Sequence, residues 1–403
     1  MKILFISYNG ALEPIMSSQG LPYFERLSKE GDFQISLLSF EKDIYLKNKE
    51  MKLKLSKELR DNKITWYQLK YHKKPKIIST VFDVFYGLFY TLSLVKKQRI
   101  IIVHARSYVP AMITCLVKKC LKIKFIFDMR GMMIDEYAEG GIFKRGGFIY
   151  KIGKKIEKIL LVSSDAIVVL TEAIGNEIKN KMILNPGTKV TVIPCCVNLV
   201  QFSFKKDITK ETLGLGKKTV FVYSGSIGTW YNFEGLIDFF KTVHNQLPQA
   251  HLLVLSHAPA EDIKKIAADK GVNLDNVTIE RVEHDRMPLY LSCSDVGLAF
   301  YKKGYSRMAC SPVKLAEYLA CGLPVIINSG VGDTRSIIEK NKVGVILEEF
   351  TPKGYEQAFK AFSELSNEGD GLRRRCRNTA ETFFSIDNAI NKYREIYLEL
   401  GMS

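Results

Sequence analysis

The sequence predicts two α/β domains in series, each built on a parallel sheet. The chain has 403 residues, more than one compact core normally holds, and this length fits two domains of about 200 residues each. Short apolar runs recur along both halves, and segments of helical periodicity separate them. This alternation is typical of β-α-β units. The chain is 46% hydrophobic and 25% charged, a balance that excludes disordered and fibrous proteins.

The apolar runs define the strands expected in each domain. Few polar residues alternate within them, which is the pattern of strands covered by helices on both faces. In the first half the expected strands are residues 2–8, 33–40, 64–71, 100–105, 124–129, 166–171 and 190–195. In the second half they are residues 219–224, 251–256, 277–282, 296–301, 324–328 and 343–347.

The domain boundary is expected in the polar stretch 198–216. Pro194 ends the last strand of the first half, and Gly214 and Gly216 precede the first strand of the second. We therefore assign residues 1–200 to the first domain and 201–384 to the second. Residues 385–400 then form an amphipathic helix. Its apolar stripe is Ile386, Ala389, Ile390, Tyr393, Ile396, Tyr397 and Leu400.

Residues 77–95 form a long apolar segment with lysines before and after it. A spanning helix needs about 20 such residues, but Asp83 interrupts this one and a strand follows closely. A buried domain helix is the favoured interpretation, and a helix lying on a bilayer remains the alternative. Phe82, Phe85, Tyr86 and Phe89 serve as core residues in the first case and as interfacial anchors in the second.

Basic residues are concentrated in the first half of the chain. Residues 1–200 contain 33 Lys and Arg against 18 Asp and Glu, a net charge of +15, whereas residues 201–403 carry only +1. A field located on one domain indicates an anionic partner such as a membrane surface, a polyanionic substrate or a nucleic acid. A lysine-rich proteome is the simpler explanation, but that bias would also raise the charge of the second half.

Cysteine usage and the first residues favour a cytosolic protein. The eight cysteines show neither zinc-site nor redox-dithiol spacing. The apolar run at residues 1–7 is too short for a signal peptide and is expected to be the first strand.

The most informative motif is a helix start and stop followed by a buried strand, at residues 311–326. Ser311 is expected to cap the helix, with Pro312 in its first turn, and Gly322 and Pro324 end it. The free amides of a helix N-terminus bind phosphate. Lys314 lies in the first turn, where a cation opposes the helix dipole and therefore needs an anion. An ordinary capped helix with a surface ion pair is the alternative.

This motif resembles the donor-site helix of the retaining glycosyltransferases of family 4, which have the GT-B fold. The resemblance continues along most of the chain, in order, through residues 8–10, 18–23, 103–108, 127–131, 169–172, 192–198 and 223–226. It implies two Rossmann-like domains that face a cleft, an acceptor-side domain first and a nucleotide-sugar domain second. It also implies that the final helix, within 385–403, crosses back to the first domain.

The resemblance also implies the roles of individual residues. The expected catalytic residues are His104, which would end a strand near the donor sugar, Arg130 and Lys314. The expected donor-binding residues are Gly225, Ser226, Val282, Glu283, Arg307, Ser311, Pro312, Val313 and Glu317, of which Glu317 would bind the ribose hydroxyls. Gln19, Arg106 and Asp128 are expected on the acceptor side. No Asp-x-Asp pair follows a strand, so we expect no metal and no cofactor beyond the nucleotide-sugar substrate.

Three positions depart from the family pattern. Ala309 stands where many members have a glutamate eight residues before the second one, here Glu317. Ser226 and Asn232 stand where many members place an arginine and a lysine that bind the diphosphate. Cationic groups elsewhere, among them Lys314, Arg307, Arg106 and Arg130, would then have to replace them.

The predicted function is transfer of a sugar, with retention of configuration, from a nucleoside diphosphate to a glycan or lipid-linked acceptor. The setting expected from charge and family is bacterial surface polysaccharide synthesis, at the inner face of the plasma membrane and without nucleic acid. A catalytically inactive partner subunit and a nucleotide-sugar epimerase are the alternatives. A Rossmann oxidoreductase is disfavoured, because Arg335 stands where the glycine-rich fingerprint needs its third glycine.

Overall fold

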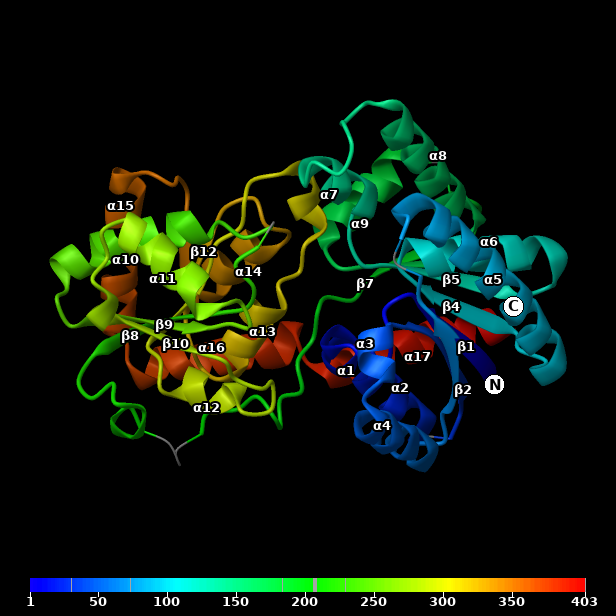
Figure 1. Cartoon of the computed structure of the whole chain (residues 1–403), viewed down its shortest axis with the longest axis horizontal. Coiled ribbons are helices and arrows are strands. Elements are labelled where there is room, and N and C mark those ends of the chain that lie inside the picture. The colour runs from blue at the N-terminus through cyan, green and yellow to red at the C-terminus, as the bar shows by residue number, and fades with distance from the viewer. Residues whose placement is uncertain (30, 73, 183, 206–208, 229, 403) are drawn as a thin grey trace. The chain divides into compact units, whose positions relative to one another are not determined.

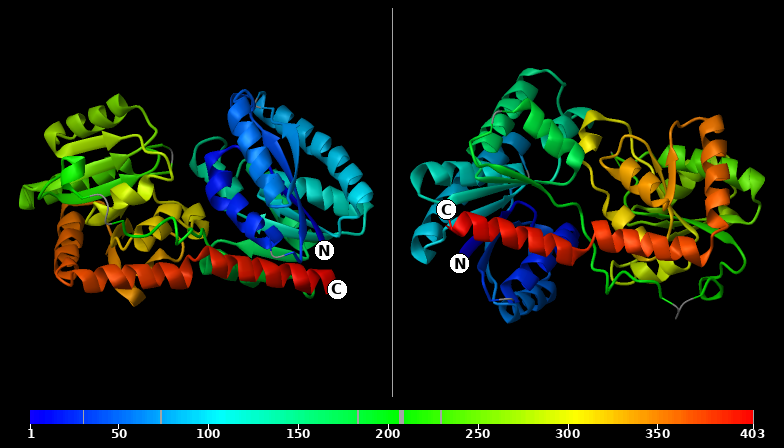
Figure 2. Two further views of the ribbon diagram at one scale, coloured as in Figure 1. Left: turned by 90° about the horizontal axis from the view of Figure 1, so that it is seen from below. Right: turned by 180° about the vertical axis from the view of Figure 1, so that it is seen from behind.

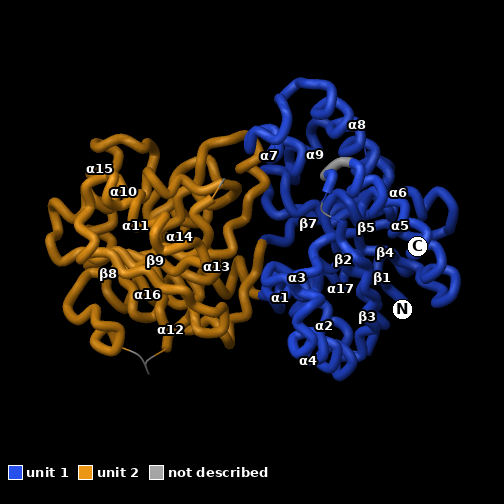
Figure 3. Tube along the Cα trace, viewed as in Figure 1, with its two compact units in different colours: residues 1–194, 386–403 blue, residues 195–385 orange. Residues whose placement is uncertain are grey.

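The protein is described by a computed structural model that covers residues 1–402 except 30, 73, 183, 206–208 and 229. The chain divides into two compact units (Figure 3). Unit 1 contains Met1–Pro194 and Ile386–Ser403, and unit 2 contains Cys195–Ser385. The sequence-based boundary lies six residues further along the chain.

Unit 1 is a seven-stranded parallel sheet in the order β3-β2-β1-β4-β5-β6-β7. Its strands are β1 (Lys2–Ser7), β2 (Gln34–Glu41), β3 (Thr65–Lys70), β4 (Ile102–Arg106), β5 (Lys124–Met129), β6 (Ala166–Val169) and β7 (Lys189–Val192). Each coincides with one of the predicted apolar runs. The central strands are buried along nearly their whole length, as expected for a sheet covered on both faces.

Ten α-helices surround this sheet in the described part of unit 1. They are α1 (Pro14–Gln19), α2 (Leu21–Lys29), α3 (Asp43–Leu46), α4 (Lys49–Asp61), α5 (Lys76–Gln98), α6 (Tyr108–Cys120), α7 (Met133–Glu139), α8 (Phe148–Ser163), α9 (Glu172–Lys181) and α17 (Ile386–Met402). The last of these is the predicted returning helix, and its contact with α2 and β4 of unit 1 is confirmed (Figure 2). Its predicted stripe is buried from Ile386 to Tyr397.

Unit 2 is a six-stranded parallel sheet in the order β10-β9-β8-β11-β12-β13. Its strands are β8 (Thr219–Ser224), β9 (Ala250–Leu255), β10 (Val277–Glu280), β11 (Val296–Ala299), β12 (Val325–Asn328) and β13 (Gly344–Leu347). Its α-helices are α10 (Phe233–Gln246), α11 (Ala260–Asp269), α12 (Met287–Ser292), α13 (Val313–Ala320), α14 (Thr334–Asn341), α15 (Pro352–Ser366) and α16 (Asp370–Phe383) (Figure 1). The predicted pair of parallel α/β sheets is confirmed.

Strand order reverses direction once in each sheet. The reversal lies between β1 and β4 in unit 1 and between β8 and β11 in unit 2. Open α/β sheets bind ligands at the carboxyl ends of the strands beside such a switch point. A ligand site is therefore expected at the loops after β4 and β5 in unit 1 and after β8 and β11 in unit 2.

The long apolar segment is the helix α5. Among the described residues, α5 is the one helix that is long and apolar enough to cross a membrane, over Ile78–Gln98. Its Asp83 is nevertheless fully buried in unit 1. The Asp83 carboxylate accepts a hydrogen bond from the Tyr8 hydroxyl at 2.8 Å and contacts the His72 ring. The helix is thus anchored to its own domain by a polar group on one face.

A close contact fixes α13 against the sheet of unit 2. Tyr318 of α13 is fully buried, and its hydroxyl lies 2.8 Å from the Ser224 amide and 2.9 Å from the Ser224 hydroxyl, at the end of β8. Its ring lies directly over Gly297 of β11, where an added Cβ would come within 2.2 Å of the ring. Only a glycine leaves room for this packing.

We expect Gly297→Ala to destabilise unit 2 by about 2–3 kcal/mol, because overpacking forces a buried ring out of place. Gly371→Ala is the matched control, since Gly371 lies in α16 with no atom within 4 Å of its added Cβ. Alanine there should stabilise the helix by about 0.5–1 kcal/mol. Urea unfolding of both variants measures the difference. Equal unfolding midpoints for Gly297→Ala and the wild type would refute the packing of α13 on β11.

Candidate functional site

A buried lysine lies at the start of α13, beside the switch point of unit 2. The Lys314 ammonium lies 4.1 Å from the ring centroids of Tyr223 and Tyr231 and 5.9 Å from that of Tyr301. Tyr223 comes from β8, and Tyr301 follows β11. Within the described residues the ammonium has no hydrogen-bond partner. Burial lowers the pKa of Lys314 to about 7, because the surrounding groups compensate its charge only in part.

The loop after β8 approaches this lysine by its backbone. Gly225 has φ of 127°, and a Cβ there would lie 3.1 Å from the Lys314 ammonium. A side chain would therefore fill the space between the loop and the ammonium. The carbonyl of Ser226 accepts a hydrogen bond from the Tyr223 hydroxyl, which fixes the loop to the aromatic cage of Tyr223, Tyr231 and Tyr301.

Asn232, one of the three departures from the family pattern described above, has a structural role here. Its side chain accepts a hydrogen bond from the Gly235 amide at 3.2 Å and caps the N-terminus of α10. A lysine at this position would leave that amide uncapped. The cation near this loop is thus supplied by α13 rather than by the start of α10.

The start of α13 differs from the prediction in one respect. Ser311 was expected to cap the helix, but Pro312 occupies the N-cap position with an extended conformation, and the helix begins at Val313. The Ser311 hydroxyl instead accepts a hydrogen bond from the Cys195 amide at 3.1 Å. The predicted end is as observed, because Gly322 has φ of 74° after the C-cap residue.

Glu317 lies one turn beyond Lys314 and is paired with a histidine. Its carboxylate lies 2.8 Å from Nε2 of His284, which follows β10. Burial opposes the charge on the His284 ring, but the hydrogen bond and charge of Glu317 outweigh it and raise the pKa of His284. The Glu317 side chain is 9% exposed and that of His284 47%. The pair therefore forms a wall of the site that is open to solvent on the histidine side.

Sequence reasoning did not single out His284 as a functional residue. It named the neighbouring Val282 and Glu283, of which Val282 is buried in the core and Glu283 is exposed. His284 and Glu317 are 33 residues apart, so no helical or strand repeat in the sequence predicts their contact. Their contact arises from the sheet order, which the sequence does not encode in a local pattern.

Arg307 lies in a short 3₁₀ helix, Tyr305–Ala309, and is largely buried. Its guanidinium lies 5.0 Å from the ring centroid of Trp230, in the loop after β8, and donates a hydrogen bond to the Ser306 hydroxyl at 2.7 Å. Ala309, another of the departures from the family pattern described above, is buried at the end of the same turn. The segment therefore places the Arg307 guanidinium beside the loop after β8. Residue 309 contributes no carboxylate there.

Unit 1 gathers four charged or titratable groups at the carboxyl ends of β4 and β5. Asp128 is fully buried, and its carboxylate lies 3.6 Å from a nitrogen of each of Arg106, Arg130 and His104. Burial alone would raise the pKa of Asp128, but the charges of Arg130 and Arg106 lower it to about 2. Two guanidinium groups thus converge on one buried carboxylate near the carboxyl ends of β4 and β5.

His104 does not end its strand as predicted. It is the third of the five residues of β4, whose last residue is Arg106, and it is fully buried. Its Nδ1 lies 2.7 Å from the Tyr397 hydroxyl, and its ring packs against Phe5 and Tyr393. This enclosed side chain lies against the Asp128 carboxylate and restricts its position. Gln19, another predicted cleft residue, lies at the end of α1 and is also buried.

Among the described residues, no group of three or more His, Cys, Asp and Glu side chains is placed to hold a metal ion. Metal independence stays a prediction.

Two family profiles match the chain in succession. Residues 56–201 match Glycosyltransferase Family 4, and residues 205–383 match Glycosyl transferases group 1. Together the two matches reach into both units and include Lys314, Glu317 and the Asp128 cluster. No curated protein sequence matches the chain.

Several solved structures share the fold at low sequence identity. Sucrose-phosphate synthase from Thermosynechococcus elongatus superposes with a TM-score of 0.79 at 15% identity, over 100% of this chain and 99% of that chain. HepE from Anabaena in complex with UDP-glucose gives 0.69 at 12% identity, over 99% and 100%. WaaG, a glycosyltransferase involved in lipopolysaccharide biosynthesis, gives 0.67 at 14% identity, over 96% and 98%. These likenesses establish the fold.

The buried lysine makes a prediction about stability. Because burial disfavours the charged form of Lys314, the full penalty on folding applies below pH 7 and fades as the pH rises from 7 towards 10.5. Lys314→Met should therefore unfold at a higher temperature than the wild type at pH 7, and the difference should shrink towards pH 10. Lys360→Met, an exposed change on α15, serves as the control. A Lys314→Met variant that melts below the wild type at pH 7 would contradict the uncompensated charge.

Proposed function

Since this chain belongs to glycosyltransferase family 4 and transfers a sugar from a nucleoside diphosphate donor, we propose that it retains the anomeric configuration and uses a glycan or lipid-linked acceptor. Unit 2 binds the donor and unit 1 the acceptor. The observation that carries this assignment is the caged Lys314 ammonium at a helix N-terminus, with Gly225 beside it and Glu317 one turn further along the helix.

In this proposal the diphosphate supplies the anion that the cage lacks. The bond between the anomeric carbon and the diphosphate breaks through an oxocarbenium-like transition state, and negative charge develops on the leaving diphosphate. Lys314, Arg307 and the free amides of α13 neutralise that charge. These groups are held in place before the substrate arrives, so little reorganisation is needed during the reaction.

Glu317 is assigned to the ribose of the donor. A carboxylate accepts hydrogen bonds at both oxygens, and only Oε1 is engaged by His284 in this structure. The ribose hydroxyls then bind Oε2 and compete for Oε1. HepE was solved with UDP-glucose, which makes a uridine donor the first to test.

The Asp128 cluster is assigned to the acceptor side. Arg106 and Arg130 present positive charge at the edge of the sheet, and His104 acts as a positioning residue for Asp128 rather than as a sugar contact. The excess charge of residues 1–200 favours an acceptor with phosphate or carboxylate groups. We place the reaction at the inner face of the plasma membrane, in the synthesis of a bacterial surface polysaccharide.

Glu317→Ala tests the donor site. Loss of hydrogen bonds to a charged group costs about 1.5–3 kcal/mol, so the variant should bind the nucleotide at least about tenfold more weakly. The measurement is a thermal-shift titration with UDP, GDP, CDP and dTDP, with and without magnesium. Glu356→Ala, an exposed change in the same unit, should behave as the wild type.

One nucleotide that stabilises the wild type without magnesium, and not Glu317→Ala, supports the proposal and identifies the donor base. No stabilisation by any of the four indicates an inactive partner subunit, which the departures at Ala309, Ser226 and Asn232 would explain. Turnover of the sugar nucleotide without acceptor, in contrast, indicates an epimerase.

Donor binding should also depend on pH. A diphosphate beside Lys314 favours the protonated ammonium, whose pKa without an anion beside it is about 7. Affinity should therefore be constant below pH 7 and fall by up to about tenfold per pH unit above it. UDP-glucose is the probe, because a terminal phosphate would itself titrate near pH 6. Calorimetry between pH 6 and 9 measures the effect, which Lys314→Met should abolish. A pH-independent wild type would remove Lys314 from the diphosphate site.

A further inference from the structure

One helix of unit 1 exposes a continuous apolar stripe. Along α5 the exposed large apolar side chains are Ile78 (68% exposed), Val81 (50%), Phe82 (54%), Phe85 (51%), Tyr86 (42%) and Phe89 (68%). Their spacing of three and four residues places them on one face of the helix. A soluble protein rarely exposes so many large apolar groups side by side without using them.

The opposite face of α5 is firmly packed. Val84, Leu94 and Val95 belong to the core of unit 1, and Gly87 lies against Ile113 of α6 so closely that an added Cβ would meet it at 2.6 Å. Together with the buried Asp83, these contacts keep the helix in the domain. The exposed stripe is therefore a fixed feature of the folded surface.

Basic residues lie at both ends of the stripe. Lys74 precedes α5, and Lys96, Lys97 and Arg99 follow the last aromatic residue, all of them exposed. Lys96 lies on the same face as Phe82, Phe85 and Phe89, because it continues their helical spacing. An apolar strip with cationic ends is the arrangement of helices that lie in the interface of a bilayer, with the rings among the acyl chains and the lysines at the phosphates.

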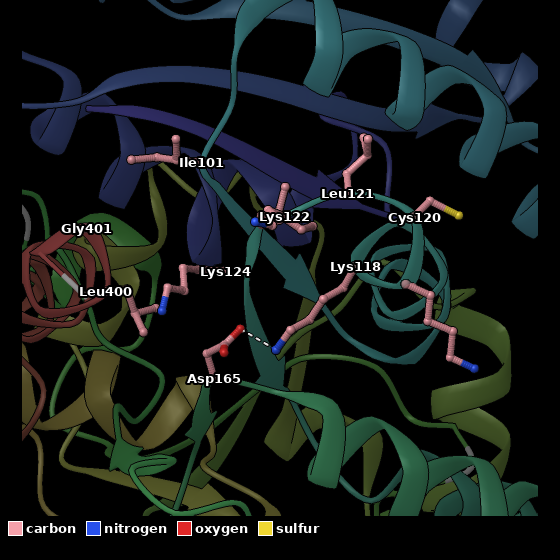
Figure 4. Close-up of a pocket in the computed structure, with 11 residues that line it drawn as sticks. Ile101, Lys118, Cys120, Leu121, Lys122, Lys124, Asp165, Leu400 and Gly401 are labelled. Atoms are coloured by element: carbon pink, nitrogen blue, oxygen red, sulfur yellow. Dashed lines mark hydrogen bonds and ion pairs between the residues drawn. The ribbon is translucent and has the colours of Figure 1, made fainter.

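The basic region continues past the end of α5. A pocket of about 620 Å³ begins at Ile101, two residues after Arg99, at the amino ends of β4 and β5 (Figure 4). It lies at the opposite end of the sheet from the Asp128 cluster, so it is separate from the acceptor site proposed above. Its lining includes Lys118, Lys119, Lys122 and Lys124. Asp165 is its one lining carboxylate and pairs with Lys118 at 2.6 Å.

We propose that the α5 stripe (Ile78, Val81, Phe82, Phe85, Tyr86 and Phe89) is a membrane-binding surface that inserts into a bilayer containing anionic phospholipids. The aromatic rings supply the apolar contact, and the lysines at the ends of α5 select negatively charged headgroups. This inference is linked to the proposed function because a lipid-linked acceptor would lie in the same membrane. Membrane binding itself does not require catalytic activity.

The test uses the full-length protein and sedimentation with two kinds of vesicle, phosphatidylcholine alone and phosphatidylcholine with one third phosphatidylglycerol. The wild type should bind the anionic vesicles and lose binding as salt is raised. The double variant Phe85→Glu with Phe89→Glu should reduce the partition coefficient at least about tenfold. Leu53→Glu is the matched control, since Leu53 is 69% exposed on α4 of the same unit; it should bind as the wild type.

A second double variant, Lys96→Glu with Lys97→Glu, tests the choice of lipid. It should lose the preference for anionic vesicles. Wild-type binding to neither vesicle, equal binding to both, or unchanged binding by the phenylalanine variant would overturn the proposal. Self-association through the stripe in place of vesicle binding would overturn it as well.

Nucleotide-induced thermal shifts distinguish this inference from the proposed function. Both α5 variants should keep the wild-type shift, which shows that they are folded. Glu317→Ala should keep vesicle binding. A protein that binds vesicles but no nucleotide would refute the donor site alone, and one that binds nucleotide but no vesicle would refute the membrane surface alone.

Discussion

The buried charge of Lys314 is the constraint that the surrounding side chains of unit 2 have to accommodate. An ammonium removed from water is costly unless it is paired, and the faces of Tyr223, Tyr231 and Tyr301 compensate it only in part. The nearest acid on the helix, Glu317, is engaged by His284. The protein thus carries a cation that a single bound anion would satisfy. The charge of such a group opposes folding, and the proposed donor site gives a reason for its presence in a well-packed core.

The rest of unit 2 holds this charge in place. Tyr318 fixes α13 to the end of β8 through Ser224, and Gly297 leaves space for the Tyr318 ring. The cage takes one tyrosine from β8, one from the loop after it and one from two residues beyond β11, so it forms only at the switch point where those two strands lie side by side. The proposed diphosphate site needs no cation from the loop after β8, where Asn232 instead caps α10. The departures from the family pattern are therefore compatible with a working donor site.

The sequence predicts the sheets well because burial on both faces leaves a direct trace in composition. All thirteen strands fall on apolar runs, and Gly322 marks the end of α13 by its positive φ. Details that depend on three-dimensional packing were less accessible. His104 follows an apolar run and was therefore expected at the end of its strand. The strand instead continues for two residues to Arg106. The choice between Ser311 and Pro312 as the cap depends on one ψ angle, and the contact of His284 with Glu317 depends on which strands are neighbours.

The two units use basic residues in physically different ways. In unit 2 the decisive cation is buried, where few solvent ions reach it and its interaction with a bound anion is strong and local. In unit 1 the excess charge lies mostly on exposed lysines, including those around α5, where each contributes little but their fields add over a surface. In the two proposals made above, the first arrangement suits a compact diphosphate and the second suits an extended anionic surface. The proposed membrane contact explains why the rings of α5 are exposed. An apolar stripe between cationic ends matches a bilayer, whose phosphates lie above its acyl chains.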